Sequence, residues 1–329
     1  MGLQKNLDLQ MHEFDIIKRY FSKLSSNNKS SLSLNDDVFF DKSRKLIVTI
    51  DTYVEGIHFI DFKKPNLVIK KILRSSLSDL ICKGVLPKYY FISGSGDKKT
   101  FSQNNLKKIS KSLKVEQQKY KIFLCGGDTV FSKKLSFTIT SIGFSNKIIF
   151  RNNAKLNDDI YVTGNLGDSY TGLCILKDKI KTNKILKNYF IDKYFHPELH
   201  LRITKRLFSI ANTSIDLSDG LISDLNKLIN KQNLSYKLFI NKIPISKNLE
   251  KLIYIKKLNK VDFISQGDDY QILFTAKPSK SRIINRIAKS LGIKISKIGK
   301  ICSKKLKPQI IDQKGYIIQL KKHGYYHKF

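Results

Sequence analysis

The segment IDLSDGLISDL, residues 215–225, places three aspartates beside serine and glycine in a chain that is poor in acidic residues. The whole chain has 61 Lys and Arg against 27 Asp and Glu. Other aspartates occur in the same setting, where an apolar segment stops beside Gly, Ser, Thr or Asn. We expect these carboxylates to gather at one edge of a sheet, where loops converge. They are Asp36 and Asp37 in LNDDV, Asp51 in LIVTIDT, Asp79 in LSDL, Asp128 in LCGGDT, Asp216 and Asp219 in IDLSDG, and Asp268 and Asp269 in QGDDY.

Carboxylates that point at one place repel one another, so they need cations or protons between them. Oxygen ligands without a Cys or His cluster favour Mg²⁺ or Ca²⁺, and Mg²⁺ commonly bridges carboxylates to nucleotide phosphates. Gly126 and Gly127 of LCGGDT would let backbone N–H groups approach a phosphate closely. The sequence contains no GxxxxGK[ST], no GxGxxG at a strand–helix junction and no HRD or DFG set. These absences argue against P-loop, dinucleotide-binding and protein-kinase sites.

Each of these features also has a structural explanation. A GGD is common in turns, and an Asp-Asp pair in a loop commonly caps a helix. His58 in EGIHF could be a core histidine, and Ser218 could cap the helix that follows it. Asp224 is expected to be a solvated helix residue. The number of such carboxylates in an acid-poor chain favours the metal hypothesis over these explanations.

The net charge of +34 would suit a nucleic-acid-binding protein, which is the alternative from a different functional class. However, the lysines are spread along the whole chain and accompany abundant Ile and Asn, as an AT-rich coding bias would produce on solvated surfaces. We favour that explanation and expect no nucleic-acid partner. The positive charge would still attract polyanionic small molecules such as nucleotides.

Composition predicts a soluble globular protein. Of the 329 residues 41% are hydrophobic, and no apolar run approaches the ~18 residues that a membrane helix needs. No signal peptide is recognisable, and Met11 is an alternative start that would make residues 1–10 an extension. Four widely separated cysteines indicate reduced thiols and a cytoplasmic location. Since no apolar run is long enough for a membrane helix, we expect no membrane partner.

The spacing of apolar residues predicts strands alternating with helices in both halves, which indicates α/β or α+β domains. A reset of the pattern near residues 146–160 indicates a boundary between domains at 11–148 and 149–329. A strand is expected to end at Asp51, and a buried strand is expected over 121–129. Helices are expected at 12–24, 67–84, 104–120, 166–178, 196–211, 221–232 and 281–292. The other strands are expected at 88–96, 135–144, 159–164, 213–220, 237–245, 265–276 and 295–301.

Taken in order, these stretches resemble the thiamine-monophosphate kinase family, in the superfamily of aminoimidazole ribonucleotide synthetase and selenophosphate synthetase. The family's stretches look like STDTLVEGVHF, NLSDLAAMGA, GGDT, IDLSDGL-SDL and GGEDYELLF. This chain has TIDTYVEGIHF, SLSDLICKGV, GGDT, IDLSDGLISDL and QGDDYQILF. The resemblance runs from about Met11 to the C-terminus.

This resemblance implies ATP-dependent phosphorylation of thiamine monophosphate to thiamine diphosphate by direct in-line transfer. It also implies a homodimer with a two-domain fold, in which an N-terminal sheet domain pairs with its mate and the active site lies between the domains. Carried over by position, several Mg²⁺ ions would be held by Asp37, Thr49, Asp51, Asp79, Asp128, Asp216 and Asp219. ATP would contact Gly126, Gly127, Arg151 and Ser218. The thiamine phosphate would contact His58, Asp268 and Tyr325.

Five departures from the family pattern bear on the expected site. Asn35 replaces a glycine, and asparagine tolerates a left-handed backbone nearly as well. Asp268 is one methylene shorter than the family's glutamate. The others are Ile50 for threonine, Ser76 for asparagine and Gln266 for glycine. Because the expected metal-binding aspartates are all present, we predict an active enzyme. Another ATP-dependent enzyme of the superfamily, with a different acceptor, is the alternative.

Overall fold

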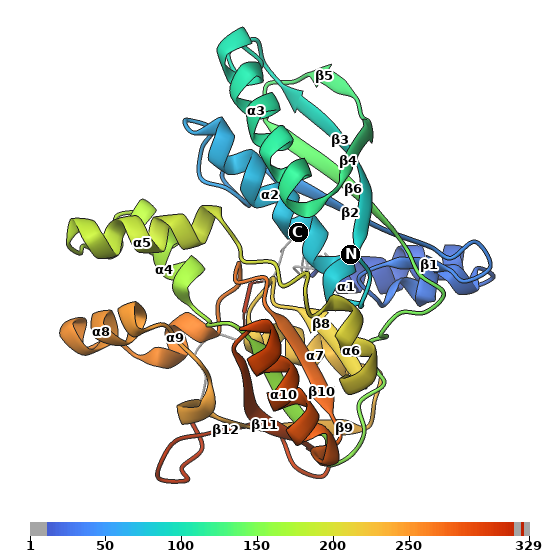
Figure 1. Cartoon of the computed structure of the whole chain (residues 1–329), viewed down its shortest axis with the longest axis vertical. Coiled ribbons are helices and arrows are strands. Elements are labelled where there is room, and N and C mark those ends of the chain that lie inside the picture. Colours follow the sequence, from blue (N-terminus) through green and yellow to red (C-terminus); the bar gives the residue numbers. More distant parts are fainter. Residues whose placement is uncertain (1–11, 319–323, 326–329) are drawn as a thin grey trace, which may run out of the picture.

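Two mixed β-sheets, each with its own helices, make up the chain in a computed structural model that describes residues 12–318, 324 and 325. The first sheet lies with helices α2 and α3 in the upper half of Figure 1, and the second lies with α6, α7 and α10 in the lower half. This arrangement confirms the expected α/β class. The predicted boundary at residues 148 and 149 falls between the two sheets, whereas the predicted domain start at Met11 lies outside the described residues.

The first sheet has the order β1-β2-β6-β3-β4, with β5 also paired to β3. Its long strand β2 alternates buried and exposed side chains, as β-branched residues do on a half-covered sheet. The prediction that this strand ends at Asp51 is wrong, because the ladder continues past it and pairs Val54 with Ser136 of β6. The strands are β1 (Phe39–Asp41), β2 (Leu46–Val54), β3 (Pro87–Gly96), β4 (Phe123–Gly126), β5 (Thr129–Phe131) and β6 (Ser136–Phe144).

Strand β4 was predicted to be buried, and this prediction is also wrong. All four of its residues are exposed. It lies at the edge of the sheet, and in the described part of the chain the helices cover only the other face. An apolar run such as Phe123–Leu124 therefore marks a strand but does not reveal whether the same chain covers it.

Helix α2 (Pro65–Cys82) is the element shared by both halves. Proline opens it, and 14 of its 18 residues are buried. It packs on β2 and β6 on one side and on β8 and α5 (Lys184–Phe195) on the other. A helix buried on all sides needs apolar residues around its whole circumference, and this explains the run of Ile and Leu. Helix α3 (Gln103–Tyr120) covers α2, and Arg74 forms a buried ion pair with Glu116 at 2.7 Å.

The second sheet has the order β12-β9-β11-β7-β10-β8. Its central strands β7 and β10 are buried throughout, as the apolar runs at 160–162 and 272–274 predict. The strands are β7 (Asp159–Thr163), β8 (Thr213–Asp216), β9 (Leu234–Phe239), β10 (Ile272–Ala276), β11 (Ile295–Ser303) and β12 (Gln309–Ile311). Around it lie α4 (Asp168–Leu176), α6 (Thr204–Ile210), α7 (Leu221–Leu228), α8 (Lys247–Lys256), α9 (Lys260–Ile264) and α10 (Ser281–Leu291).

Two helical predictions need correction. The helix expected over 196–211 begins only at Thr204, because the preceding segment contains Pro197 and turns so that His200 bonds Gln271. The helix expected over 12–24 changes pitch from α1 (Glu13–Ile16) to a π-helix and then a 3₁₀ turn. Its apolar side chains consequently form no core face, and Leu24 is 83% exposed. Within the described residues, no helix is both long enough and apolar enough to cross a membrane.

Candidate active site

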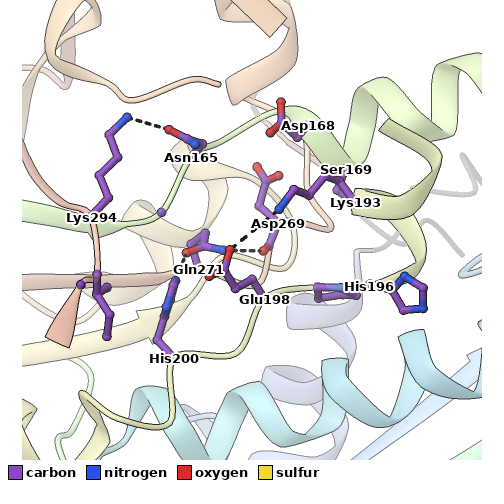
Figure 2. Close-up of a pocket in the computed structure, with 14 residues that line it drawn as sticks. Asn165, Asp168, Ser169, Lys193, His196, Glu198, His200, Asp269, Gln271 and Lys294 are labelled. Atoms are coloured by element: carbon purple, nitrogen blue, oxygen red, sulfur yellow. Dashed lines mark hydrogen bonds and ion pairs between the residues drawn. The ribbon is translucent and has the colours of Figure 1, made fainter. Parts of the chain in front are cut away.

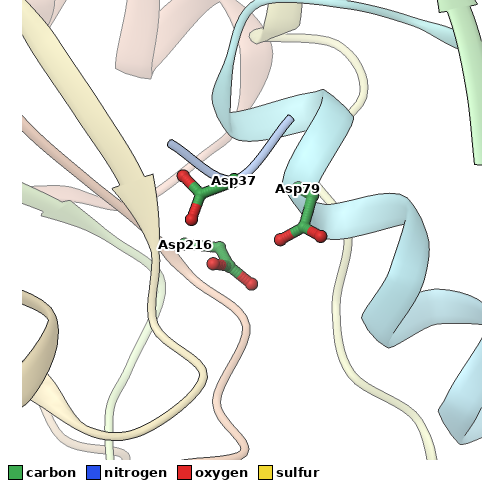
Figure 3. A group of neighbouring side chains, drawn as sticks. All are labelled: Asp37, Asp79 and Asp216. Carbon is green, nitrogen blue, oxygen red and sulfur yellow. The ribbon is translucent and has the colours of Figure 1, made fainter. Parts of the chain in front are cut away.

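Three aspartates from distant parts of the chain converge between the two sheets (Figure 3). Asp37 lies in the loop before β1, Asp79 on the last turn of α2, and Asp216 at the end of β8. Each offers a carboxylate oxygen, and the three oxygens lie within 4.8 Å of one another. The carboxylates therefore meet where the two halves join, and the expectation that they gather at one edge of a sheet is wrong.

Hydroxyl groups orient these carboxylates. Thr49 on β2 donates a hydrogen bond of 2.6 Å to Asp79, and Ser78 donates one of 2.6 Å to Asp216. Ser78 was not identified from the sequence, although it lies directly before Asp79 in the SLSDL stretch. It faces the other domain, so its role follows only from the packing of α2 against β8.

Electrostatics at this junction favour bound cations. Withdrawal from water is the main cause that raises the pKa of Asp51 to about 6 and that of Asp216 to about 6, and it raises the pKa of Asp79 well above its ordinary value. The neighbouring aspartate charges raise the pKa of Asp79 further. Such carboxylates are stable when protonated or when cations lie between them. Because the converging group holds oxygen ligands alone, its chemistry fits Mg²⁺.

Asp36 and Asp37 already have cationic partners from the protein. Lys83 contacts Asp36 at 2.7 Å and Asp37 at 2.6 Å. Arg151 forms an ion pair with Asp37, and its backbone N–H donates to Asp36 at 3.0 Å. Arg151 was expected to contact ATP, and the structure places its guanidinium on Asp37 at the cleft wall. Lys83 was not identified from the sequence.

A cleft of about 740 Å³ opens beside the converging aspartates. This volume falls in the range of small-molecule sites, roughly 300–1,000 Å³. Residues of both halves line it, including most of those singled out in the sequence. These are Asp37, Thr49, Asp51, His58, Asp79, Arg151, Asp216, Ser218, Asp219, Asp268 and Tyr325.

The three residues expected to contact the thiamine phosphate line the same cleft. The backbone N–H of Val54 donates to Nδ1 of His58 at 3.0 Å, which leaves Nε2 as the protonated nitrogen of the neutral ring. Asp268 pairs with the buried Lys71 at 2.8 Å and accepts from the Tyr270 hydroxyl at 3.1 Å. Tyr325 is tied to Asp219 by a backbone bond of 3.0 Å.

The structure leaves Gly126, Gly127 and Asp128 outside this cleft. Asp128 lies beside β3, and β3 is separated from β2 by β6. Asp51 and the β4–β5 turn are thus three strand spacings apart, roughly 14 Å. Packing alone requires glycine at position 127, because a Cβ there would lie 1.8 Å from the carbonyl oxygen of Ile92.

Comparisons with known proteins agree with this geometry. A family model described as AIR synthase related protein, N-terminal domain, matches residues 35–145. The thiamine-monophosphate kinase of Buchnera aphidicola subsp. Schizaphis graminum (strain Sg) is 35% identical over 97% of this chain and 99% of its own length. That of Haemophilus influenzae (strain KW20) is 34% identical over 90% of this chain and 91% of its own. The chain belongs to the thiamine-monophosphate kinase family.

A solved structure described as AaThiL complexed with AMPPCP and TMP superposes with a TM-score of 0.82. It is 25% identical and covers 96% of this chain and 97% of its own. The resemblance inferred from the motifs is therefore confirmed, and so is the two-domain, synthetase-like fold that it implied. The alternative of a nucleic-acid-binding protein is not needed to account for any observed feature of the cleft.

Departures from the thiamine-monophosphate kinase pattern have local explanations. Asp268 has a φ of 72°, a left-handed conformation in which aspartate is enriched several-fold, so its replacement of glutamate suits the backbone. Asn35 has a φ of −128°, and the expectation of a left-handed backbone there is wrong. Its side chain instead exchanges two hydrogen bonds with Asn230, at 3.0 and 3.1 Å.

Asp224 was expected to be solvated, and that expectation is wrong. The residue is fully buried, and its Oδ2 accepts from the backbone N–H groups of Asp219 and Gly220 at 3.0 and 3.1 Å. Lys227 bridges Asp224 and Asp219. Asp224 therefore fixes the loop that carries Ser218 and Asp219 at the start of α7, a role that depends on the loop closing back over the helix.

A second, smaller pocket of about 200 Å³ lies on the other side of the loop that carries Asp268. Figure 2 shows Asp168, Asp269, Gln271 and His200 around it. His200 bonds Gln271 at 2.7 Å, and Asp269 accepts from the backbone of Gly167 at 2.8 Å. None of the site residues carried over from the family lines this pocket. Its hydrogen bonds to Asp269 and Gln271 fix the segment that follows Asp268.

Protons and Mg²⁺ should compete for the buried aspartates. Because the folded pKa values of Asp51 and Asp216 lie near 6, above the ordinary 3.8, folding without metal takes up protons. Their contribution to stability therefore falls as the pH rises from about 4 to about 6, where repulsion between ionised carboxylates sets in. We expect Mg²⁺ to raise the melting temperature several degrees more at about pH 7.5 than at about pH 5.

Differential scanning calorimetry with Mg²⁺, or with NaCl at matched ionic strength, measures this difference. The NaCl series corrects for screening of the general positive charge. An equal effect of Mg²⁺ at both pH values would contradict the assignment of these carboxylates as ligands.

Proposed function

We propose that this chain carries out the reaction of its family, the ATP-dependent phosphorylation of thiamine monophosphate, by direct in-line transfer in the cleft between its two sheets. The observation that carries the proposal is the convergence of Asp37, Asp79 and Asp216 within 4.8 Å beside that cleft. A carboxylate group of this kind suits phosphoryl transfer, where catalysis is mostly positioning and charge stabilisation. As support, the related AaThiL has been solved in complex with AMPPCP and TMP.

The residues that would hold Mg²⁺ are the cleft aspartates Asp37, Asp51, Asp79, Asp216 and Asp219, with Thr49 beside them. When bound, the ions would neutralise phosphate oxygens and bring two polyanions together. Thr49 and Ser78 fix the orientation of the Asp79 and Asp216 carboxylates through their 2.6 Å hydrogen bonds. A fixed set of oxygens is what Mg²⁺ requires, because it demands a near-octahedral arrangement.

The acceptor in this reaction requires no strong general base from the protein. A phosphate monoester has a second pKa of about 6, so its oxygen is already ionised at neutral pH. The chain's residues instead bind and orient the two substrates. Arg151, held on Asp37, and the ring of His58 both line the cleft and would contact the substrates there. Asp268, which lines the cleft while paired with Lys71, would contact the thiamine phosphate.

The purified chain should form thiamine diphosphate from thiamine monophosphate and ATP only when Mg²⁺ is present. Free thiamine is the control acceptor, because it lacks the ionised phosphate oxygen and should give no product. Chromatographic separation of the thiamine phosphates measures the outcome. Product from thiamine alone, or ATP binding with no transfer to the monophosphate, would refute this choice of acceptor.

Asp79→Asn and Asp219→Asn should each lower kcat by roughly 100-fold or more while the fold survives. A metal ion contributes several kcal/mol to stabilising the transition state, and each factor of ten in rate corresponds to about 1.4 kcal/mol. Asp159→Asn is the matched control, since it removes a buried carboxylate that pairs with Lys297 away from the cleft. Steady-state kinetics and circular dichroism on the three variants decide the point. Wild-type kinetics in both site variants would refute the carboxylate model.

We also infer that the chain acts as a homodimer through the uncovered face of its first sheet. The strand register places Ile50, Phe123 and Phe144 on that face, and they are 66%, 52% and 52% exposed. An exposed apolar face on a sheet is typical of an interface. Asp128, which one chain leaves outside its own cleft, would then serve the cleft of the second copy together with Gly126 and Gly127.

Mixing two inactive variants tests this assembly. Asp79→Asn and Asp128→Asn should each be inactive alone, whereas co-refolded subunits should regain about a quarter of wild-type activity. In a random mixture, half of the symmetric dimers pair unlike chains, and each of those has one complete cleft. If sedimentation shows the mixture to be dimeric and no activity returns, Asp128 acts in the cleft of its own chain and this assembly is refuted.

The cysteines of the chain fit a reducing compartment. All four cysteines are free thiols, two of them buried. We infer a cytoplasmic location, where such thiols stay reduced.

A further inference from the structure

Lys83 ends helix α2 and is completely buried beside the aspartates of the cleft. An ammonium group has three N–H donors, and each finds an acceptor here. They point to Asp36 at 2.7 Å, Asp37 at 2.6 Å and the backbone carbonyl of Ser214 at 2.9 Å. A buried lysine is uncommon in proteins unless its charge is paired in this way.

The surroundings of this ammonium are those of a hard cation. Two carboxylates and a carbonyl are the oxygen donors that Mg²⁺ and Ca²⁺ take in proteins. The negative end of the α2 dipole adds to the attraction for a cation at this place. One of the contacted residues, Asp37, also offers an oxygen within 4.8 Å of Asp79 and Asp216. The lysine charge therefore lies within the carboxylate group itself.

The effect of this charge is isolated by comparing lysine with methionine at position 83, because methionine carries no charge. A methionine cannot neutralise Asp36 and Asp37. In a chain with methionine there, the two carboxylates would have Arg151 as their protein cation and would need a further positive charge.

We propose that Lys83 is a built-in cation that replaces one divalent metal ion at Asp36 and Asp37. Together with Arg151, the ammonium neutralises the pair permanently, so this chain assembles its carboxylate centre with one ion fewer than a variant that carries methionine. The inference rests on the proposed function in taking the cleft aspartates as Mg²⁺ ligands. It makes Lys83 a positioning residue, since it contacts the ligands and not the substrates.

A purely structural ion pair would respond differently to metal. Arg74 on α2 and Glu116 on α3 form a buried, bidentate ion pair, with bonds of 2.7 and 2.9 Å. Neither residue lines the cleft. Breaking that pair should cost stability whether or not metal is present, because a buried charge is left without a partner. The two pairs therefore provide a matched comparison.

The test is Lys83→Met in the full chain, with Mn²⁺ alone as the probe. Electron paramagnetic resonance of free Mn²⁺ counts the bound ions, and calorimetry records the melting temperature with and without metal. We expect the variant to bind one more ion per chain than the wild type. We also expect it to melt several degrees lower without metal and to recover most of that loss when Mn²⁺ or Mg²⁺ is added. Arg74→Met should lose stability with no change in the ion count and no recovery.

The same count in Lys83→Met and wild type, with a loss of stability that metal does not restore, would overturn the proposal and leave Lys83 a structural partner. If the single variant does not fold, Asp36→Asn/Lys83→Met decides, because it removes one charge of each sign. That double variant should fold without metal and bind the wild-type number of ions, and its failure to fold would also overturn the proposal. Thiamine diphosphate formation by the wild type, assayed in parallel, reports on the proposed function independently of the ion count.

Discussion

Mutual repulsion of buried carboxylates is the constraint on which the rest of this structure depends. Asp37, Asp79 and Asp216 approach within 4.8 Å where water is scarce. At an effective dielectric constant of about 20, one such pair repels by about 3 kcal/mol. A domain's entire net stability is only about 5–15 kcal/mol. No plausible gain from packing around the group removes that repulsion, so the site is stable only with protons or cations, and this requirement connects the fold to its chemistry.

The chain meets the requirement in two ways at two ends of the same group. Asp36 and Asp37 are neutralised by Lys83 and Arg151, which are part of the fold. Asp79 and Asp216 accept hydrogen bonds from the hydroxyls of Thr49 and Ser78 and form no ion pair with a described residue, so they retain capacity for an external ion. The first end gives the loop before β1 a fixed position, and the second supplies a site whose occupancy depends on conditions. Rigid support around an ion-dependent centre is suited to a reaction between two polyanions.

Local sequence patterns predicted most strands, because alternation is a property of short segments, and the family resemblance pointed to most of the residues that line the cleft. They did not predict what depends on distant segments. Asp224 is spaced like a solvated helix residue, yet a loop closes over it. Phe123 is apolar like a core residue, yet its strand is left uncovered. Lys83 resembles any surface lysine of this basic chain, and only the packing of the end of α2 against β8 and the loop before β1 reveals its three acceptors.

The placement of α2 between the two sheets has a consequence for how such a protein can evolve. The helix contributes to the core of the first sheet and also packs on β8 and α5 of the second half. A chain cut between the sheets would leave one side of this helix facing water, with Ser78 and Lys83 deprived of Asp216 and Ser214. The two halves are therefore not exchangeable modules. A substitution on the second sheet beneath α2 has to be compatible with metal ligands carried by the first, so the halves must change together.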